Sequence, residues 1–366
     1  MLEGSPGVVA MVEIAAHRLQ NQQIEGPRAR GAAEAVAWLG ALQGQDYTGA
    51  KWSVGLRLPG STDAQIEGAI ADHAVIRTWL IRGTLHLVAA ADIRWMLALV
   101  APRLIANNAR RYGELELDTQ TLTRSNDLLA AALQGGQQLS RPELFAMLQQ
   151  GGISTQGQRG FYMLQRASLD RLICQGVTRA NQPTFVALDD AIPAAPAMPR
   201  DQALAELALR YFTSHGPASL PDFVGWSGLT MGDARSGLEA VKAQLVEDTY
   251  AGTAYWRPSA APDTQEALVV HMLPGFDEYV LGYRDRSAVL DPLHAQKICP
   301  GGNGVFYPTI VADGQIVGTW KRTIKKQKVV VTPQPFAFLS SDAEAGFAAA
   351  AERYGAYMGL PVEIAA

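Results

Sequence analysis

The chain has 366 residues, 48% hydrophobic and 18% charged, which is enough apolar material for the cores of two or three globular domains. A formal net charge of −4 argues against a protein that coats nucleic acid by bulk attraction. It does not exclude a local basic groove, because phosphate contacts act within about one Debye length, ~10 Å. Two distant cysteines, Cys174 and Cys299, exclude a disulfide framework or a cysteine-zinc cluster and predict two reduced thiols.

The N-terminal sequence lacks the basic start and the apolar run of a signal peptide. The chain also lacks a stretch of about 18 or more uncharged apolar residues, the length that a membrane-spanning helix needs. We therefore expect a cytoplasmic protein with no membrane partner.

The first predicted unit, residues 1–105, combines helices with two short β-rich runs. Apolar residues at helical spacing predict helices over residues 32–42 and 62–72. Residues 75–81 and 84–88 are β-rich and are separated by Arg82-Gly83.

The second predicted unit, residues 106–192, follows the same order of elements. Helices are expected over residues 126–133, after Ser140, whose hydroxyl would cap the helix N-terminus, and over 159–174. The segment from Gly176 then predicts a strand, a turn and a second strand.

The third predicted unit, residues 200–257, shows this order most clearly. One helix begins at Asp201, and two shorter ones begin at Ser219 and Thr230, each with an acidic residue three positions later. Residues 246–250 and 253–257 flank an Ala-Gly turn and predict a hairpin. Three helices followed by a hairpin are the plan of a winged helix, a variant of the helix-turn-helix.

The C-terminal part, residues 265–366, differs in character and follows a Pro/Ala-rich linker over residues 258–264; a similar linker, 191–199, precedes the third unit. Strands are expected over residues 267–273, 304–311, 315–320 and 329–332, and a helix over 341–357. The predicted fold class is therefore α+β, with three tandem winged-helix units followed by a C-terminal β-barrel-like domain with a terminal helix.

Five segments resemble the AlkZ-like family of winged-helix DNA glycosylases. In chain order they are residues 42–47, 82–88, 210–229, 273–286 and 317–322. The resemblance implies a concave DNA-binding face, duplex DNA as the partner, and monofunctional hydrolysis of the N-glycosidic bonds of alkylated purines, extending in some members to interstrand crosslinks.

The family's catalytic signature is a glutamine, an apolar residue, and then a glutamine or aspartate. It maps here onto Gln43, Gly44 and Gln45, so the resemblance implies that the two glutamines are catalytic. The sequence departs from the family at Gly44, where a bulkier apolar residue is expected; glycine keeps the spacing but loosens the backbone.

A glutamine pair suits a cationic leaving group. An N7-alkylated purine is already positively charged, so its departure needs no general acid, and glutamine can orient water although it cannot take a proton. Residues i and i+2 share a face in extended backbone but not in a helix. If Gln43 and Gln45 cooperate, the preceding helix must end near Leu42 and the pair must lie in irregular backbone.

Three further candidates flank this motif. Asp46 is interpreted either as a base that orients water or as a helix cap. His86 alternates with Leu85 and Leu87, which predicts that it avoids the core face and lies near the site or DNA, or else has a structural hydrogen bond. Arg82, in the turn before it, is a DNA-contact candidate.

The best local candidate for binding DNA phosphate is residues 321–328, in which five of eight residues are basic. The candidates are Lys321, Arg322, Lys325 and Lys326. The alternative is an ordinary solvated strand edge that lysines protect from pairing.

The remaining motifs carry less chemistry. Asp277-Glu278 is either a second carboxylate site or, as we favour, an internal ion pair with Arg284 or Arg286. No His/Cys/Asp/Glu spacing indicates a metal, and no cofactor is expected. Gly301-Gly-Asn-Gly lacks the lysine and the setting of a phosphate loop.

Three functions stay open on the sequence alone. The first is a monomeric DNA glycosylase for N7-type alkylpurines or crosslinks, identified by the glutamine pair. The second is a non-catalytic winged-helix DNA-binding protein, which predicts basic recognition helices and a dimer. The third is a winged-helix scaffold that binds a small molecule or a protein, which the acidic net charge leaves possible.

Overall fold

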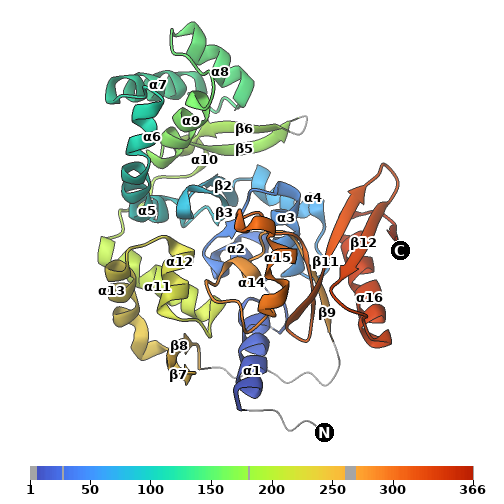
Figure 1. The fold of residues 1–366 in the computed structure, drawn as a ribbon. Coiled ribbons are helices and arrows are strands. Elements are labelled where there is room, and N and C mark those ends of the chain that lie inside the picture. The colour runs from blue at the N-terminus through green and yellow to red at the C-terminus, as the bar shows by residue number, and fades with distance from the viewer. Residues whose placement is uncertain (1–5, 27–28, 180–181, 260–268, 366) are drawn as a thin grey trace. The chain divides into compact units, whose positions relative to one another are not determined.

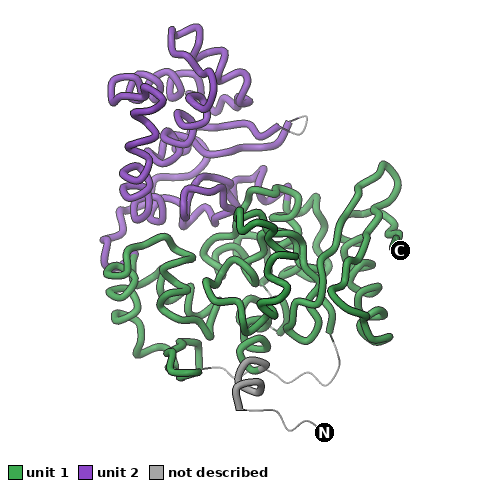
Figure 2. Tube along the Cα trace, viewed as in Figure 1, with its two compact units in different colours: residues 1–66, 204–366 green, residues 67–203 purple. Residues whose placement is uncertain are grey.

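The computed structural model describes residues 6–26, 29–179, 182–259 and 269–365, with side chains from Glu13 onward. The chain divides into two compact units, residues 1–66 with 204–366, and residues 67–203 (Figure 2). This grouping cuts across the four predicted domains, whose boundaries stay a prediction from sequence. Residues 260–268, which include most of the predicted second linker and the start of the expected strand at 267, lie outside the described residues.

The N-terminal part of the first unit is helical except around the glutamines (Figure 1). In chain order it contains α1 (Pro6–Asn21), α2 (Ala32–Leu39), β1 (Leu42–Gln43), α3 (Tyr47–Leu56) and α4 (Asp63–Ala71), which continues into the second unit. Helix α2 ends three residues before the predicted position, because Gly40 adopts φ +80°, where a helix cannot continue. Helix α3 was not predicted.

The second unit contains one antiparallel sheet with helices. Its elements are β2 (Val75–Trp79), β3 (Leu85–Ala89), α5 (Ile93–Asn107), α6 (Ala109–Glu114), α7 (Thr119–Leu133), β4 (Leu139–Ser140), α8 (Arg141–Gln150), α9 (Arg159–Leu169), β5 (Ile173–Arg179), β6 (Gln182–Ala187) and α10 (Leu188–Ala191). The strand order is β3-β2-β5-β6-β4, so the hairpins expected as separate wings of two units share one sheet. Arg77 and Gln175 pair where the two hairpins meet, and Trp79 stacks on Phe185 beneath them.

Helix α9 is shorter than the sequence predicts. It ends at Leu169, and Arg171 adopts φ +64°, which turns the chain into β5. Cys174 therefore lies in a buried strand instead of a helix, and burial raises the pKa of its thiol to about 12.

The predicted third unit has the expected order of helices and hairpin. Its elements are α11 (Arg200–His215), α12 (Leu220–Ser227), α13 (Met231–Val241), β7 (Val246–Tyr250) and β8 (Thr253–Arg257). Ser219 and Asp222 form the predicted reciprocal cap, and Thr230 caps α13 through the backbone of Asp233. Helix α12 ends at Ser227, and Gly228 follows it in the left-handed conformation. The winged-helix identity of this and the other two units stays a prediction.

The C-terminal part forms a curled half-barrel in the order β13-β12-β11-β10-β9, with α16 against β9 (Figure 1). Its elements are β9 (Val270–Leu273), α14 (Glu278–Leu281), α15 (Ala295–Ile298), β10 (Thr309–Ala312), β11 (Gln315–Ile324), β12 (Val329–Pro335), α16 (Ser341–Met358) and β13 (Val362–Ile364). The fold is thus α+β, as predicted, and the sheet is open at both edges. Ser340 caps α16, which begins at Ser341 as predicted.

Across the described ranges, no helix is both long enough and apolar enough to cross a membrane.

Candidate active site

The glutamine pair lies in a short non-helical loop of the first unit. Helix α2 ends at Leu39, β1 is extended, and α3 begins at Tyr47 with Asp46 as its N-cap. The prediction that both glutamines occupy non-helical backbone is confirmed. Extended backbone allows positions i and i+2 to share a face, which a helix would not.

The side chains of the two glutamines contact each other. Gln43 Nε2 donates to Gln45 Oε1 over 2.6 Å. This bond fixes the orientation of both amides, and the Gln45 amide retains N–H donors and a second lone pair. Such a pair can hold one water molecule as both donor and acceptor.

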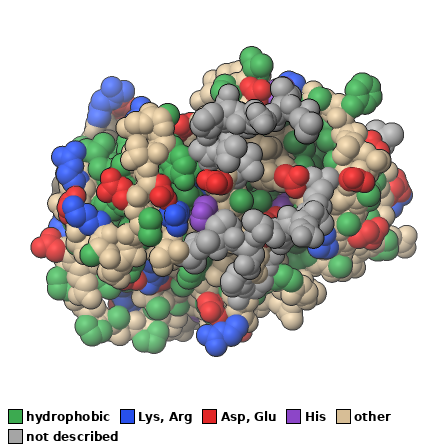
Figure 3. Space-filling model, turned by 90° about the horizontal axis from the view of Figure 1, so that it is seen from below, with side chains coloured by type: hydrophobic (Ala, Val, Ile, Leu, Met, Phe, Trp, Pro, Cys, Tyr) green, Lys and Arg blue, Asp and Glu red, His purple; other side chains and the backbone are tan. Residues whose placement is uncertain are grey.

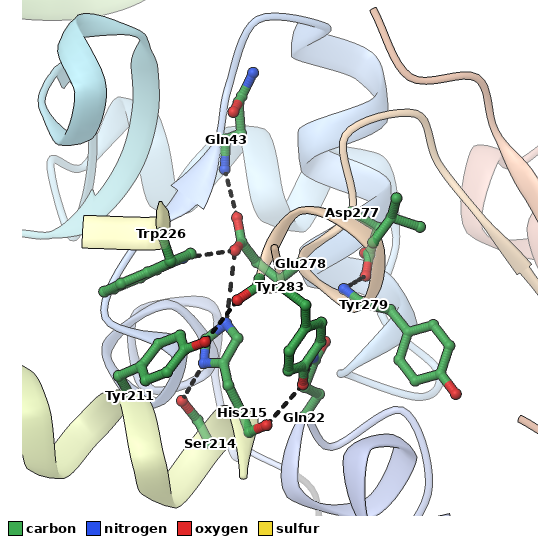
Figure 4. A network of polar contacts seen from close by, with 12 residues as sticks. Gln22, Gln43, Tyr211, Ser214, His215, Trp226, Asp277, Glu278, Tyr279 and Tyr283 are labelled. Carbon is green, nitrogen blue, oxygen red and sulfur yellow. Dashed lines mark hydrogen bonds and ion pairs between the residues drawn. The ribbon is translucent and has the colours of Figure 1, made fainter. Parts of the chain in front are cut away.

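The backbone of Gln43 is anchored to a buried carboxylate. The Gln43 N–H donates to Glu278 Oε1 over 3.1 Å, and the Trp226 indole donates to Glu278 Oε2 over 2.8 Å (Figure 4). Glu278 is fully buried at the start of α14, and the side chain of Gln43 extends away from it (Figure 4). Each oxygen of the Glu278 carboxyl group thus accepts one hydrogen bond.

His215 is the third neighbour of Glu278. Its Nε2 lies 3.5 Å from Glu278 Oε2, and its Nδ1 lies 2.8 Å from the hydroxyl oxygen of Ser214. Burial lowers the pKa of His215 and outweighs the opposite effect of Glu278, so the imidazole is neutral at pH 7. The neutral tautomer that suits the carboxylate carries its proton on Nε2.

Asp277 forms the ion pair that was expected for this acidic pair, but with a different partner. Arg57 contacts both of its carboxylate oxygens at 2.9 and 3.0 Å, and Ser53 donates over 2.6 Å. The predicted pairing with Arg284 or Arg286 is wrong. Burial alone would raise the pKa of Asp277, but Arg57 and these hydrogen bonds hold it below its usual value.

Asp46 has the contacts of a cap. Its carboxylate accepts from the Gly49 N–H over 3.0 Å, and from Arg322 over 3.0 and 2.8 Å. These bonds match the interpretation of Asp46 as a helix cap, and they do not indicate a role as the base that orients water. They also change the interpretation of Arg322: this guanidinium, 15% exposed, is bound to the glutamine loop.

The three lysines predicted to contact phosphate are exposed. Lys321 lies in β11, and Lys325 and Lys326 lie in the turn that joins β11 to β12. Lys328, just beyond them, forms an ion pair with Glu363. Of the four predicted phosphate contacts, Arg322 is therefore bound to Asp46, whereas the three lysines are exposed to solvent.

Arg82 and His86 belong to the second unit. Arg82 is partly exposed and adopts φ 56° in the turn between β2 and β3. His86 is fully buried and its Nδ1 lies 3.0 Å from the Thr84 carbonyl oxygen. The prediction that His86 avoids the core is wrong, because both faces of β3 are covered, and the contact with Thr84 matches the alternative of a structural hydrogen bond.

Within the described ranges, no group of three or more His, Cys, Asp or Glu side chains is arranged to hold a metal ion. Cys174 and Cys299 are both buried free thiols.

Sequence reasoning missed His215 and Trp226, and assigned Glu278 no specific role. The signal for Glu278 was present, since an acidic pair stands in an otherwise apolar stretch. His215 and Trp226 lie within segment 210–229, but no local pattern connects them to residue 43.

Comparison with known proteins places this geometry in context. The family model described as DNA glycosylase AlkZ-like matches residues 36–357. A Streptomyces sahachiroi protein named interstrand DNA cross-link repair glycosylase is 27% identical in an alignment of 353 positions that covers 88% of this chain and 90% of that protein. The solved Streptomyces sahachiroi DNA glycosylase AlkZ shares the fold, with a TM-score of 0.79 at 24% identity over 97% of this chain and 99% of that one. This chain belongs to the DNA glycosylase AlkZ-like family.

Proposed function

We propose that this protein is a monofunctional DNA glycosylase that hydrolyses the N-glycosidic bond of N7-alkylated purines in duplex DNA. The observation that carries the proposal is the 2.6 Å hydrogen bond between Gln43 and Gln45, in a chain of the AlkZ-like family. The bond orients both amides, and the Gln45 amide keeps donors and a lone pair that suit a single attacking water.

The chemistry of the substrate matches what amides can do. The cationic base leaves as a neutral purine without protonation, which creates an oxocarbenium-like sugar. Water then attacks the sugar and releases one proton to solvent. Gln43 and Gln45 would orient that water and stabilise the transition state by their dipoles. Asp46 acts in this proposal by capping α3 and holding the loop, and no titrating base is required.

Interstrand crosslinks are a further proposed substrate. The Streptomyces sahachiroi relative is named for crosslink repair, and a crosslink through purine N7 presents the same cationic glycosidic bond as a simple N7 adduct. The crosslinked base would leave by the same route.

DNA binding would rest on local contacts. Acidic and basic side chains are interspersed on the face drawn in Figure 3, in keeping with the net charge of −4. Lys321, Lys325 and Lys326 are the proposed phosphate contacts, with Arg82 as a candidate on the second unit. We propose that the enzyme acts as a cytoplasmic monomer without a metal or an organic cofactor.

The test is base release from duplex DNA that carries N7-methylguanine, measured under single-turnover conditions. Replacement of Gln45 by alanine should lower the rate about 100-fold, the effect of losing one preorganised polar group at a transition state. Gln137→Ala, which changes an exposed loop glutamine, is the matched control and should leave the rate unchanged.

Release no faster than the spontaneous rate would reject N7-methylguanine as a substrate, and crosslinked duplex would be tested next. Failure on both substrates, with binding retained, would favour a non-catalytic DNA-binding protein.

A further inference from the structure

The buried carboxylate of Glu278 lies directly behind the glutamine loop. It belongs to α14, 235 residues away from Gln43 in sequence, yet its two oxygens accept from the Gln43 N–H and the Trp226 indole. We propose that Glu278 is a positioning residue for the glutamine pair: through the backbone of Gln43 it sets where the Gln43 amide lies relative to Gln45. This inference rests on the proposed function.

The part of the loop that carries Gln43 is short. Its strand β1 is two residues long, and the next residue, Gly44, has no side chain that could pack against the core. The side-chain bond to Gln45 orients the amide but does not fix the backbone from which it extends. The bond from the Gln43 N–H to the buried Glu278 carboxyl group acts on that backbone directly.

Glu278 is itself held on more than one side. Trp226 donates to it, and the same indole packs below the start of the loop, since a Cβ added at Gly40 would lie 3.4 Å from the Trp226 ring. His215 faces the carboxylate at 3.5 Å, and Tyr211 stacks on the imidazole at 4.8 Å. The carboxylate thus connects the glutamine loop to helices α11 and α12 (Figure 4).

The contacts of the neighbouring Asp277 differ from those of Glu278. Asp277 forms an ion pair with Arg57 and hydrogen bonds with Ser53 and the start of α14, and none of these partners lies in the loop. The loop contact therefore distinguishes Glu278 within the acidic pair.

The test variant is Glu278→Gln, which keeps the size of the side chain and one acceptor oxygen. Its NH2 group must face one of two donors, the Gln43 N–H or the Trp226 indole, so one bond is lost. Asp222→Asn is the matched control, because Asp222 is an equally buried carboxylate of the same unit whose bonds to Ser219, Arg284 and Asp285 do not involve the loop.

Two measurements are needed on the full chain. Hydrogen–deuterium exchange of a peptide spanning residues 42–46 should be at least about tenfold faster in Glu278→Gln than in the wild type, and unchanged in Asp222→Asn. Single-turnover base release should fall about tenfold or more in Glu278→Gln, with DNA affinity within about twofold of wild type. A loss confined to the chemical step is not expected from a merely structural change.

The inference fails if exchange in the loop is unchanged in Glu278→Gln, or if its activity falls only in proportion to thermal stability, as in the control. If Glu278→Gln does not fold, Trp226→Phe removes one donor to the carboxylate and should give smaller effects of the same direction. If the wild type releases no base, the proposed function fails, while the exchange measurement still decides whether Glu278 positions the loop.

Discussion

Gln43 and Gln45 are separated by one residue, and a hydrogen bond joins their amides. Glutamine neither gains nor loses a proton near neutral pH. The same loop ends in Asp46, whose carboxylate is bound by Arg322 and by the backbone of α3. Chemistry that depends only on orientation and dipoles has a distinct kinetic signature.

That signature is a flat pH profile. We expect the single-turnover rate on N7-methylguanine duplex to vary less than about twofold between pH 6 and pH 8, because no proton transfer to an enzyme base limits the reaction. The measurement is the rate at half-unit intervals, corrected for spontaneous release. A rate that rises through an apparent pKa in this range would identify a general base and contradict the assignment to the glutamines.

The fully buried ion pair of Arg57 with Asp277 lies near the site. Arg57 is fully buried and also donates to the carbonyl oxygens of Gln22 and Ser53. Arg57→Met should lower the free energy of unfolding by about 3–5 kcal/mol, because it leaves the Asp277 charge buried without its partner. Urea denaturation measures this change. Arg30→Ala, which removes an exposed ion pair with Glu34, is the control, and an equal loss in both variants would contradict the prediction.

At the scale of elements, local patterns account for most helices and hairpins. The caps at Ser140, Ser219 and Thr230 and the hairpin of β7 and β8 follow from residues within one or two turns of each other. The loop that carries the glutamines also follows from local sequence, because Gly40 ends α2. What local sequence cannot encode is a contact such as Asp46 with Arg322, 276 residues apart, or the joining of two hairpins into one sheet.

The turn between β11 and β12 carries the element-scale prediction. Lys325 and Lys326 are exposed there, and removing the charge that neutralises one phosphate should reduce the slope of log affinity against log salt by about 0.9. The double variant Lys325→Ala/Lys326→Ala should therefore bind duplex DNA more weakly and lower that slope by about two. Fluorescence anisotropy at several salt concentrations measures it.

Lys297→Ala is the control for this experiment, because Lys297 lies over the Phe336 ring away from the turn. An unchanged slope in the double variant would leave the turn as an ordinary solvated strand connection.

At the scale of the full chain, folding lowers the pKa of two buried histidines, His17 and His215, in the unit that holds the glutamines. Burial, with help from Arg257 and against Asp248, lowers the pKa of His17 to about 4, and burial also lowers that of His215. The unfolded chain binds these protons more readily than the folded one. The contribution of these two neutral histidines to the free energy of unfolding is therefore fully present above about pH 6.5. It is lost as the pH falls from there toward 4.

His17→Gln should weaken that acid sensitivity. The wild type should lose on the order of 2 kcal/mol through His17 between pH 7 and pH 4, and the variant should lose correspondingly less. Urea denaturation at both pH values measures the difference. His294→Gln, which changes a partly exposed histidine, is the control, and identical pH dependence in wild type and His17→Gln would contradict the assignment.

The proposed mechanism assigns hydrolysis of a cationic purine's glycosidic bond to the glutamine pair. The decisive experiment follows both products from N7-methylguanine duplex, for the wild type and for the Gln43→Ala/Gln45→Ala variant. We expect the wild type to yield free N7-methylguanine and an intact abasic strand that breaks only on alkaline treatment, and the folded variant to yield neither above the spontaneous rate. Equal yields from both proteins would place the chemistry elsewhere and contradict this mechanism.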